Sequence, residues 1–234
     1  YKLKIAYIFY CTILPLFILY CLIKKPMKTL VIIPSRLSAT RLPGKPLLKI
    51  NGTSMISHVF KKAEEANIGE VIVATEDQEI VDDVKKNGGQ VILTKKHHKT
   101  GTDRIYEALQ KFNNTDIDLI MNLQGDEPLM NIEDIRGLNN QMIKNQSELG
   151  TLASEIKDKT IYKNQNIVKA ITTEKLDNLN FPEAMNFVRK DLKDIKNIYH
   201  HLGIYCYQKE TLKNFVSFNQ SKNELKSKLE QLRA

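Results

Sequence analysis

An apolar run that ends abruptly in a cationic loop constrains the fold of this chain more than any other feature. Residues 30–33 read Leu-Val-Ile-Ile, with no polar residue among them. Such a run is typical of a strand that is buried on both faces of a parallel sheet. Ligands of open α/β sheets bind beyond the carboxyl ends of such strands, so the loop that follows is the first candidate for a site.

That loop, residues 34–46 and here called the cation loop, carries Arg36, Arg41 and Lys45. Three prolines and a glycine within it keep the backbone out of a helix. Two arginines can fork onto phosphate oxygens and a lysine adds a mobile point charge, so the set suits a triphosphate. A solvated basic surface loop is the alternative. The loop matches neither the Walker pattern nor the Gly-x-Gly-x-x-Gly dinucleotide turn.

Helical and extended patterns alternate after the cation loop. The expected elements are an Asn51-Gly52 turn, a helix at 54–67, a strand at 71–74, a helix at 79–87, a strand at 91–93, a helix at 103–112 and a strand at 119–123. This alternation predicts an α/β, doubly wound fold with a mainly parallel sheet. Beyond residue 150, β-like runs at 151–156, 167–172 and 203–207 indicate a substrate lid and partner-contact region on the same sheet.

Composition narrows the classes of partner. The 234 residues are 42% hydrophobic and carry a formal net charge of +8, which favours an anionic partner. Lysines are scattered, without an arginine-rich stripe, which argues against nucleic-acid binding. The three cysteines show neither metal-ligand nor disulfide spacing, so we expect a reducing, cytoplasmic environment.

Five motifs occur in order along the chain. They are the segment 32–47, His98-Lys99-Thr100-Gly101-Thr102-Asp103-Arg104, Asn122-Leu123-Gln124-Gly125-Asp126-Glu127-Pro128, His201-Leu202-Gly203-Ile204-Tyr205 and Leu229-Glu230-Gln231-Leu232-Arg233. Together they resemble the sugar-acid cytidylyltransferases, and closely the 3-deoxy-manno-octulosonate (Kdo) cytidylyltransferase family, from Met27 to the last residue.

The resemblance implies a fold like that of the nucleotide-diphospho-sugar transferases. It implies transfer of CMP from CTP to the anomeric hydroxyl of Kdo, giving CMP-Kdo and pyrophosphate for lipopolysaccharide synthesis. Mg²⁺ as cofactor and a homodimer are further implications. A cytidylyltransferase for another acidic sugar, such as sialic acid, is the alternative within enzymes.

Asp126 follows the strand expected at 119–123, so we expect it at the same sheet edge as Arg36. A carboxylate there would hold Mg²⁺ against a triphosphate. The resemblance implies the same metal role for Asp126 and a sugar contact for Gln124. The alternative is a turn aspartate that caps the next helix.

The segment 100–104 opens a helix, with Thr102 expected as its N-cap and Asp103 in its first turn. Capping alone could explain this composition. The resemblance implies instead that the loop closes over the base and ribose, with contacts from Thr100 and Arg104. His97 and His98 are expected to be solvated.

The remaining assignments also follow the resemblance. The expected nucleotide site comprises Ser35, Arg36, Arg41, Lys45, Thr100 and Arg104, with Arg36, Lys45 and Asp126 as catalytic residues. Arg189 is the last residue of a segment that imperfectly matches a family element whose arginine contacts the sugar carboxylate. The alternative is that this segment is an ordinary surface strand. His201 matches a histidine that lines the sugar pocket, and a satisfied core histidine is its alternative.

The ends of the chain carry separate expectations. Residues 5–23 are uncharged and long enough for a membrane span, with lysines on both sides. Because the first methionine is Met27, we expect residues 1–26 to be upstream translated sequence and 27–234 to be the catalytic domain. A non-catalytic, membrane-tethered nucleotide-binding protein is the alternative. The resembling family continues past residue 234 to a second metal-binding aspartate, so we expect C-terminal truncation, weak metal binding and slow turnover.

Overall fold

The computed structural model describes residues 26–234 apart from 39–41, 97, 159, 178–179 and 191–194. Arg41, His97 and the apolar segment 5–23 lie outside the described residues. Within the described part, no helix has the length and apolar character needed to cross a bilayer.

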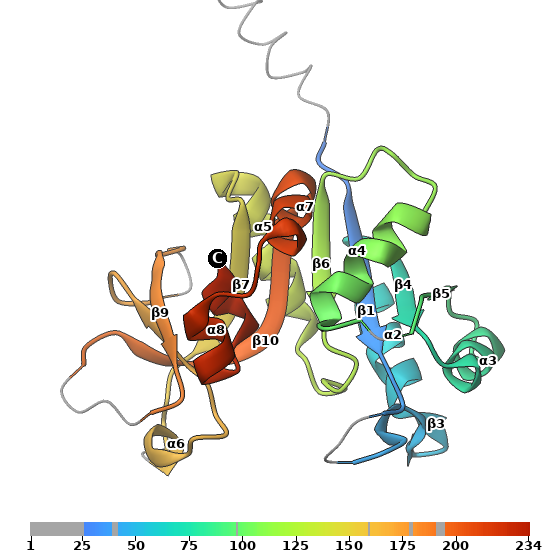
Figure 1. Cartoon of the computed structure of the whole chain (residues 1–234), viewed down its shortest axis with the longest axis horizontal. Coiled ribbons are helices and arrows are strands. Elements are labelled where there is room, and N and C mark those ends of the chain that lie inside the picture. Colours follow the sequence, from blue (N-terminus) through green and yellow to red (C-terminus); the bar gives the residue numbers. More distant parts are fainter. Residues whose placement is uncertain (1–25, 39–41, 97, 159, 178–179, 191–194) are drawn as a thin grey trace, which may run out of the picture.

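One sheet of eight strands organises the chain (Figure 1). Its parallel half contains, in spatial order, β5 (Val91–Leu93), β4 (Gly69–Thr75), β1 (Thr29–Ser35) and β6 (Leu119–Leu123). Its antiparallel half contains β10 (Ile198–Gln208), β8 (Lys169–Thr172) and β9 (Ala184–Val188), and β7 (Leu149–Ser154) also pairs with β10. The parallel half confirms the doubly wound α/β prediction, and the runs beyond residue 150 extend the sheet with reversed strands.

Strand β1 is the centre of the parallel half. It pairs with β4 along its whole length and with β6 over Thr29–Ile32. Val31 and Ile33 pack against one face, and Leu30 and Ile32 against the other, all four fully buried. Successive side chains of a strand point to opposite faces, so this uninterrupted apolar run serves two cores, as predicted.

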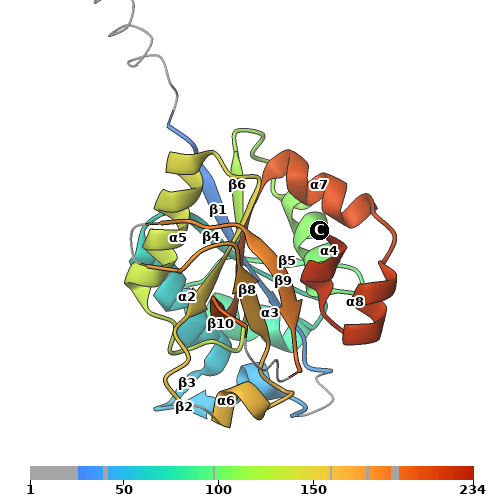
Figure 2. The same ribbon diagram turned by 90° about the vertical axis from the view of Figure 1, so that its left-hand side faces the viewer.

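Helices cover both faces of the sheet (Figure 2). The helices α2 (Met55–Ala66), α3 (Gln78–Lys86) and α5 (Ile132–Asn145) pack on one face. The helices α4 (Gly101–Lys111) and α7 (Lys209–Ser217) pack on the other. Short elements complete the fold: η1 (Lys45–Leu47), β2 (Lys49–Ile50), β3 (Thr53–Ser54), α6 (Thr160–Lys163), α8 (Lys222–Ser227) and η2 (Glu230–Arg233).

Two helix starts differ from the expectations. The N-cap of α4 is Thr100 and not Thr102, because Thr100 and Asp103 form a reciprocal capping box while Thr102 is buried. The helix after Asp126 was expected without bounds; it is α5, and its N-cap is Asn131, whose side chain accepts a hydrogen bond from the Glu133 N–H at 2.9 Å. Asp126 is therefore not the cap of the next helix.

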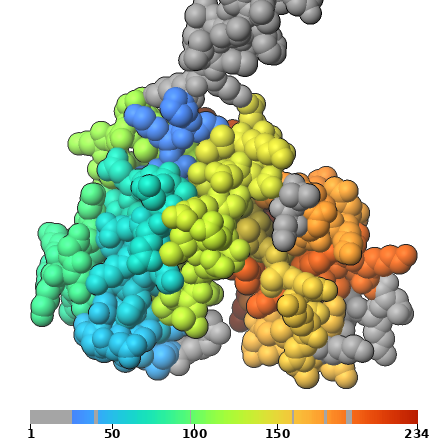
Figure 3. Space-filling view, turned by 180° about the vertical axis from the view of Figure 1, so that it is seen from behind, coloured from blue at the N-terminus to red at the C-terminus, as the bar shows by residue number. Residues whose placement is uncertain are grey.

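The strand order reverses beside β1. The chain proceeds outward from β1 to β4 and β5 and then returns across β1 to β6. In open α/β sheets such a switch point leaves a crevice beyond the carboxyl ends of the two strands. The space-filling view shows the lower edge of the molecule hollowed between its N-terminal and C-terminal segments (Figure 3).

Candidate functional site

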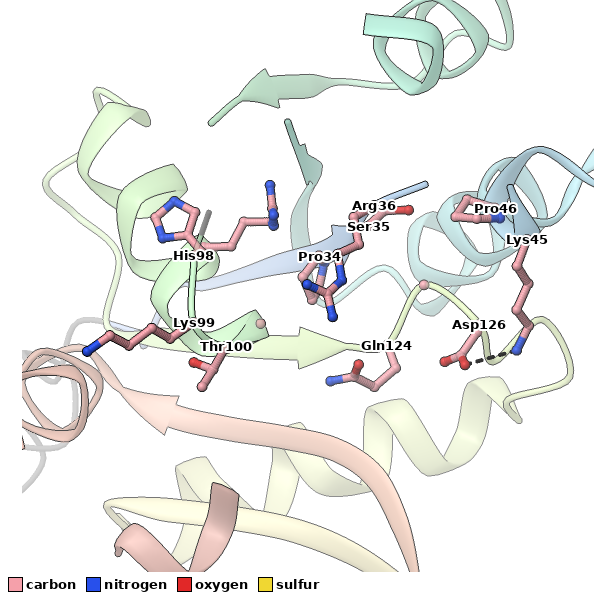
Figure 4. A pocket seen from close by; sticks show the side chains of 13 residues that line it. Pro34, Ser35, Arg36, Lys45, Pro46, His98, Lys99, Thr100, Gln124 and Asp126 are labelled. Carbon is pink, nitrogen blue, oxygen red and sulfur yellow. Dashed lines mark hydrogen bonds and ion pairs between the residues drawn. The ribbon is translucent and has the colours of Figure 1, made fainter. Parts of the chain in front are cut away.

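A cavity of about 290 Å³ lies beyond the carboxyl ends of β1 and β6 (Figure 4). We call it the switch-point cavity. Its lining residues come from the end of β1 and the cation loop, the start of α4, and the loop after β6: Pro34, Ser35, Arg36, Lys45, Pro46, His98, Lys99, Thr100, Gly101, Arg104, Gln124, Gly125 and Asp126. Three motifs far apart in the sequence thus meet at one place. The strand ends predicted this meeting for Arg36 and Asp126, whereas only the resemblance implied it for the segment 100–104.

Opposite charges from two loops pair at the wall of this cavity. Lys45 Nζ lies 3.0 Å from Asp126 Oδ2, although the residues are 81 positions apart (Figure 4). About a third of the Lys45 side chain and half of the Asp126 side chain are exposed, so both groups can reach a ligand. Arg36 is exposed and lines the same cavity.

The floor of the cavity carries an unsatisfied hydroxyl. Ser35, the last residue of β1, is buried, and its Oγ has no hydrogen-bond partner among the described residues. Leaving a buried hydroxyl unpaired costs free energy, and nearly all such groups in native proteins are paired. The position of this hydroxyl suits a ligand oxygen.

The acidic edge of the cavity suits a cation. Burial and the nearby Asp126 carboxylate raise the pKa of Glu127, against the opposing effect of Lys45. The described residues contain no group of three or more potential metal-ligating side chains. Mg²⁺ commonly takes only one or two protein carboxylates and completes its shell with phosphate oxygens and water. Asp126 therefore fits a magnesium ion that arrives with a nucleotide.

Arg104 forms part of the cavity wall and is already paired. Its buried guanidinium donates from Nη1 to Thr94 Oγ1 at 2.7 Å and from Nη2 to Glu76 Oε2 at 2.8 Å. The Glu76 carboxylate neutralises it in place. A direct nucleotide contact from Arg104 stays a prediction.

His98 is half-buried and not simply solvated, so that expectation was wrong. Its Nε2 lies 2.5 Å from Glu107 Oε2. Burial alone would raise the pKa of Glu107, but Lys111, the Lys95 N–H and His98 together lower it to about 2. Glu107 thereby ties the segment before Thr100 to helix α4.

Glu107→Gln should destabilise the protein at neutral pH. A carboxyl whose pKa falls from 4.5 to about 2 on folding stabilises the native state fully above pH 4.5, and this contribution is lost as the pH falls through about 2. We expect a loss of about 1 to 3 kcal/mol at pH 7 that shrinks below pH 4.5. Urea unfolding at several pH values measures it, and a pH-independent difference would contradict this account.

The side chains expected to bind the sugar divide into two groups, inside and outside the cavity. Gln124 lines the cavity, donates to Asn122 Oδ1 at 3.1 Å, and packs beside Gly203 of β10, where an added Cβ would lie 3.4 Å from its Cγ. The described residues lining the cavity include neither Arg189 nor His201.

Both residues have protein partners elsewhere. Arg189 Nη1 donates to the Asn166 carbonyl oxygen at 3.1 Å, and its Nε donates to the Ser227 carbonyl oxygen. His201 is buried on β10 with its Nε2 2.9 Å from Thr151 Oγ1. Burial, with a smaller effect of His200, lowers the pKa of His201 to about 4, so its ring is neutral at pH 7. Their sugar-binding roles stay predictions.

The C-terminal motif contributes a carboxyl to which the sequence assigned no role. Glu230 Oε1 is buried without a hydrogen-bond partner among the described residues. Burial raises its pKa despite the opposing hydroxyls of Thr102 and Thr100. Arg233 Nη2 in the same motif pairs with Glu224 Oε1 at 2.6 Å. In the sequence, Glu230 was marked only by its place in the C-terminal motif.

Comparison with known proteins finds a matching family model and relatives that share one name. The family model described as cytidylyltransferase matches residues 30–234. The 3-deoxy-manno-octulosonate cytidylyltransferase of Rhodopseudomonas palustris (strain BisB5) is 43% identical, over 88% of this chain and 84% of the relative. The protein of that name from Paramagnetospirillum magneticum is 37% identical over the same shares.

Solved structures agree with these relatives. A structure of CMP:2-keto-3-deoxy-manno-octonic acid synthetase complexed with CTP is 34% identical, covers 88% of this chain and 84% of its own, and has a TM-score of 0.78. A 4-diphosphocytidyl-2C-methyl-D-erythritol synthase from Anaerococcus prevotii, 14% identical with a TM-score of 0.54 over 87% of this chain and 83% of its own, shares the fold. The chain therefore belongs to the cytidylyltransferase family, together with relatives named 3-deoxy-manno-octulosonate cytidylyltransferase.

Proposed function

We propose that this protein transfers CMP from CTP to the anomeric hydroxyl of Kdo, releasing pyrophosphate. The observation that carries the proposal is the switch-point cavity beyond the ends of β1 and β6, where Lys45 pairs with Asp126 and Arg36 lines the same space. Relatives of about 40% identity that are named for this sugar support Kdo as the acceptor.

In the reaction, the sugar hydroxyl oxygen attacks the α-phosphorus of CTP and releases its proton to solvent. The bond from the α-phosphorus to the bridging oxygen breaks, and pyrophosphate leaves with its electron pair. Both reactants are anionic, so the main tasks of the protein are to neutralise charge and to align the reacting groups. Arg36 and Lys45 supply the positive charge, and Ser35 Oγ offers a further hydrogen bond.

Lys45 must change partners when CTP binds. In the structure its ammonium neutralises Asp126. Entry of the triphosphate draws the ammonium to the phosphates and exposes the Asp126 carboxylate at the same moment. Asp126 would then hold Mg²⁺, which neutralises the charge on the triphosphate when bound.

We assign the base and ribose to the side of the cavity formed by Thr100, with Arg104 behind it. The sugar belongs on the Gln124 side, next to Gly203 of β10. Arg189 and His201 stay candidate sugar contacts on the strength of the resemblance. We further propose that the protein works in the cytoplasm, as its cysteine pattern suggests, and as a homodimer, as the resemblance implies.

Pyrophosphate release from CTP and Mg²⁺ tests the proposal, with Kdo and sialic acid as parallel acceptors. We expect release with Kdo and none with sialic acid. Release with sialic acid alone would keep the reaction and replace the sugar. Binding of CTP without release with either acceptor would support a non-catalytic nucleotide-binding protein and contradict the proposal.

A further inference from the structure

A carboxylate outside the switch-point cavity holds the cation loop from behind. Asp77 Oδ2 accepts a hydrogen bond from the Leu37 N–H at 2.7 Å, across 40 positions of sequence. Leu37 directly follows Arg36, and its side chain packs against the core on the face of α2 and α3. Asp77 therefore fixes the backbone at the point where the Arg36 side chain emerges.

The same peptide also closes the loop. The Leu37 carbonyl oxygen accepts a hydrogen bond from the Gly44 N–H at 3.0 Å. Gly44 has a φ of 71°, a left-handed conformation that glycine adopts without strain, and it directly precedes Lys45. A shift of Leu37 would thus move both cations of the described loop.

Asp77 occupies a position where an aspartate usually serves its own helix. It is the N-cap residue of α3, and within the described structure its side chain makes no capping hydrogen bond. Its own N–H donates to Thr75 Oγ1 at 3.1 Å, which fixes the turn after β4. An N-cap aspartate normally accepts from the second or third amide of the helix. Here the carboxylate bonds the cation loop instead.

We propose that Asp77 is a positioning residue for the triphosphate contacts of Arg36 and Lys45. The inference rests on the proposed function, because it takes the switch-point cavity as the CTP site. Electrostatics alone predicts the opposite sign: removing a negative charge near a triphosphate should tighten binding. Alignment of the loop outweighs this repulsion, so losing the hydrogen-bond acceptor weakens binding.

Two variants separate the loss of the hydrogen-bond acceptor at residue 77 from the loss of its negative charge. Asp77→Ala removes both, whereas Asp77→Asn removes the charge and keeps a carbonyl oxygen that can accept from Leu37. We expect Asp77→Ala to raise the Kd and KM for CTP about tenfold, as for loss of one charge-assisted hydrogen bond. The KM for the sugar should stay within about twofold. Asp77→Asn should retain the wild-type affinity or exceed it.

Titration calorimetry of the full chain with CTP and Mg²⁺ makes the measurement, with Asp82→Ala as control. Asp82 is exposed on the same helix, and among the described residues it accepts a hydrogen bond only from Gln78. Hydrogen exchange of the Leu37 and Gly44 amides should speed up in Asp77→Ala and stay slow in Asp77→Asn. Thermal unfolding reports any general loss of structure.

The outcomes are distinct. Wild-type protein that fails to bind CTP overturns the proposed function together with this inference. If wild-type protein binds, equal or tighter binding by Asp77→Ala overturns the inference alone. A fall in thermal stability with unchanged CTP affinity per folded molecule shows a purely structural role and overturns it as well.

Discussion

Replacing Lys45 with alanine is expected to lower turnover about a hundredfold while leaving the fold intact. A pair of unit charges 4 Å apart is worth about 4 kcal/mol at an effective dielectric of 20. Partial exposure of Lys45 to solvent reduces this figure, and each 1.4 kcal/mol of lost transition-state stabilisation is a tenfold loss of rate. Pyrophosphate release at saturating CTP and Kdo measures the effect.

Lys61→Ala is the matched control for Lys45→Ala. Lys61 is exposed on α2, away from the residues that line the switch-point cavity. Both variants should unfold within a few degrees of wild type, since an exposed ion pair contributes little stability. Turnover by Lys45→Ala equal to that of Lys61→Ala would refute the phosphate role of Lys45.

Asp126→Asn should bind CTP more tightly than wild type when magnesium is absent and more weakly when it is present. With the metal chelated, the variant should bind CTP about tenfold more tightly than wild type, because Lys45 is no longer held by the carboxylate. With Mg²⁺ present the order should reverse, because the carboxylate that would hold the ion is gone. Titration calorimetry in EDTA and in Mg²⁺ gives both affinities without depending on turnover.

A double-mutant cycle shows whether the gain without metal acts through Lys45. In a Lys45→Ala background, Asp126→Asn should improve metal-free binding by much less than in wild type. An equal gain in both backgrounds would mean general charge repulsion and not an exchange of partners. Asp134→Asn is the control, since Asp134 is an exposed carboxylate in the first turn of α5.

Local signals predicted the parallel half of the sheet. The apolar run of β1, the helix-period pattern of α2 and the short strands β4, β5 and β6 are each readable within a few residues. The meeting of Arg36, Lys45 and Asp126 followed as well, because parallel strands end at a common edge. Both predictions rest on the spacing of apolar residues in the sequence and on the common direction of parallel strands.

The antiparallel half of the sheet and several side-chain contacts depend on pairings between distant segments, which no local sequence pattern indicates. The direction of β10 is decided by its pairing with β6, β7 and β8. That packing buries His201 against Thr151 and leaves Arg189 on backbone carbonyls. No role was expected for Asp77 from the sequence, because its partner, Leu37, lies 40 positions upstream. Apart from the residues that meet at the common strand edge, side chains with partners distant in sequence could not be assigned.

The strand order also dictates when the polypeptide can acquire its structure during synthesis. The central strand β1 is made first, yet its neighbours β4 and β6 come much later, so the first core cannot close before Leu123 is made. The outer edge of β6 then remains unpaired until β10, the last of the described strands, is made. Pairings between such distant segments form slowly, and an open apolar strand edge invites association with other chains. The nascent chain is therefore most prone to aggregate between completion of β6 and arrival of β10.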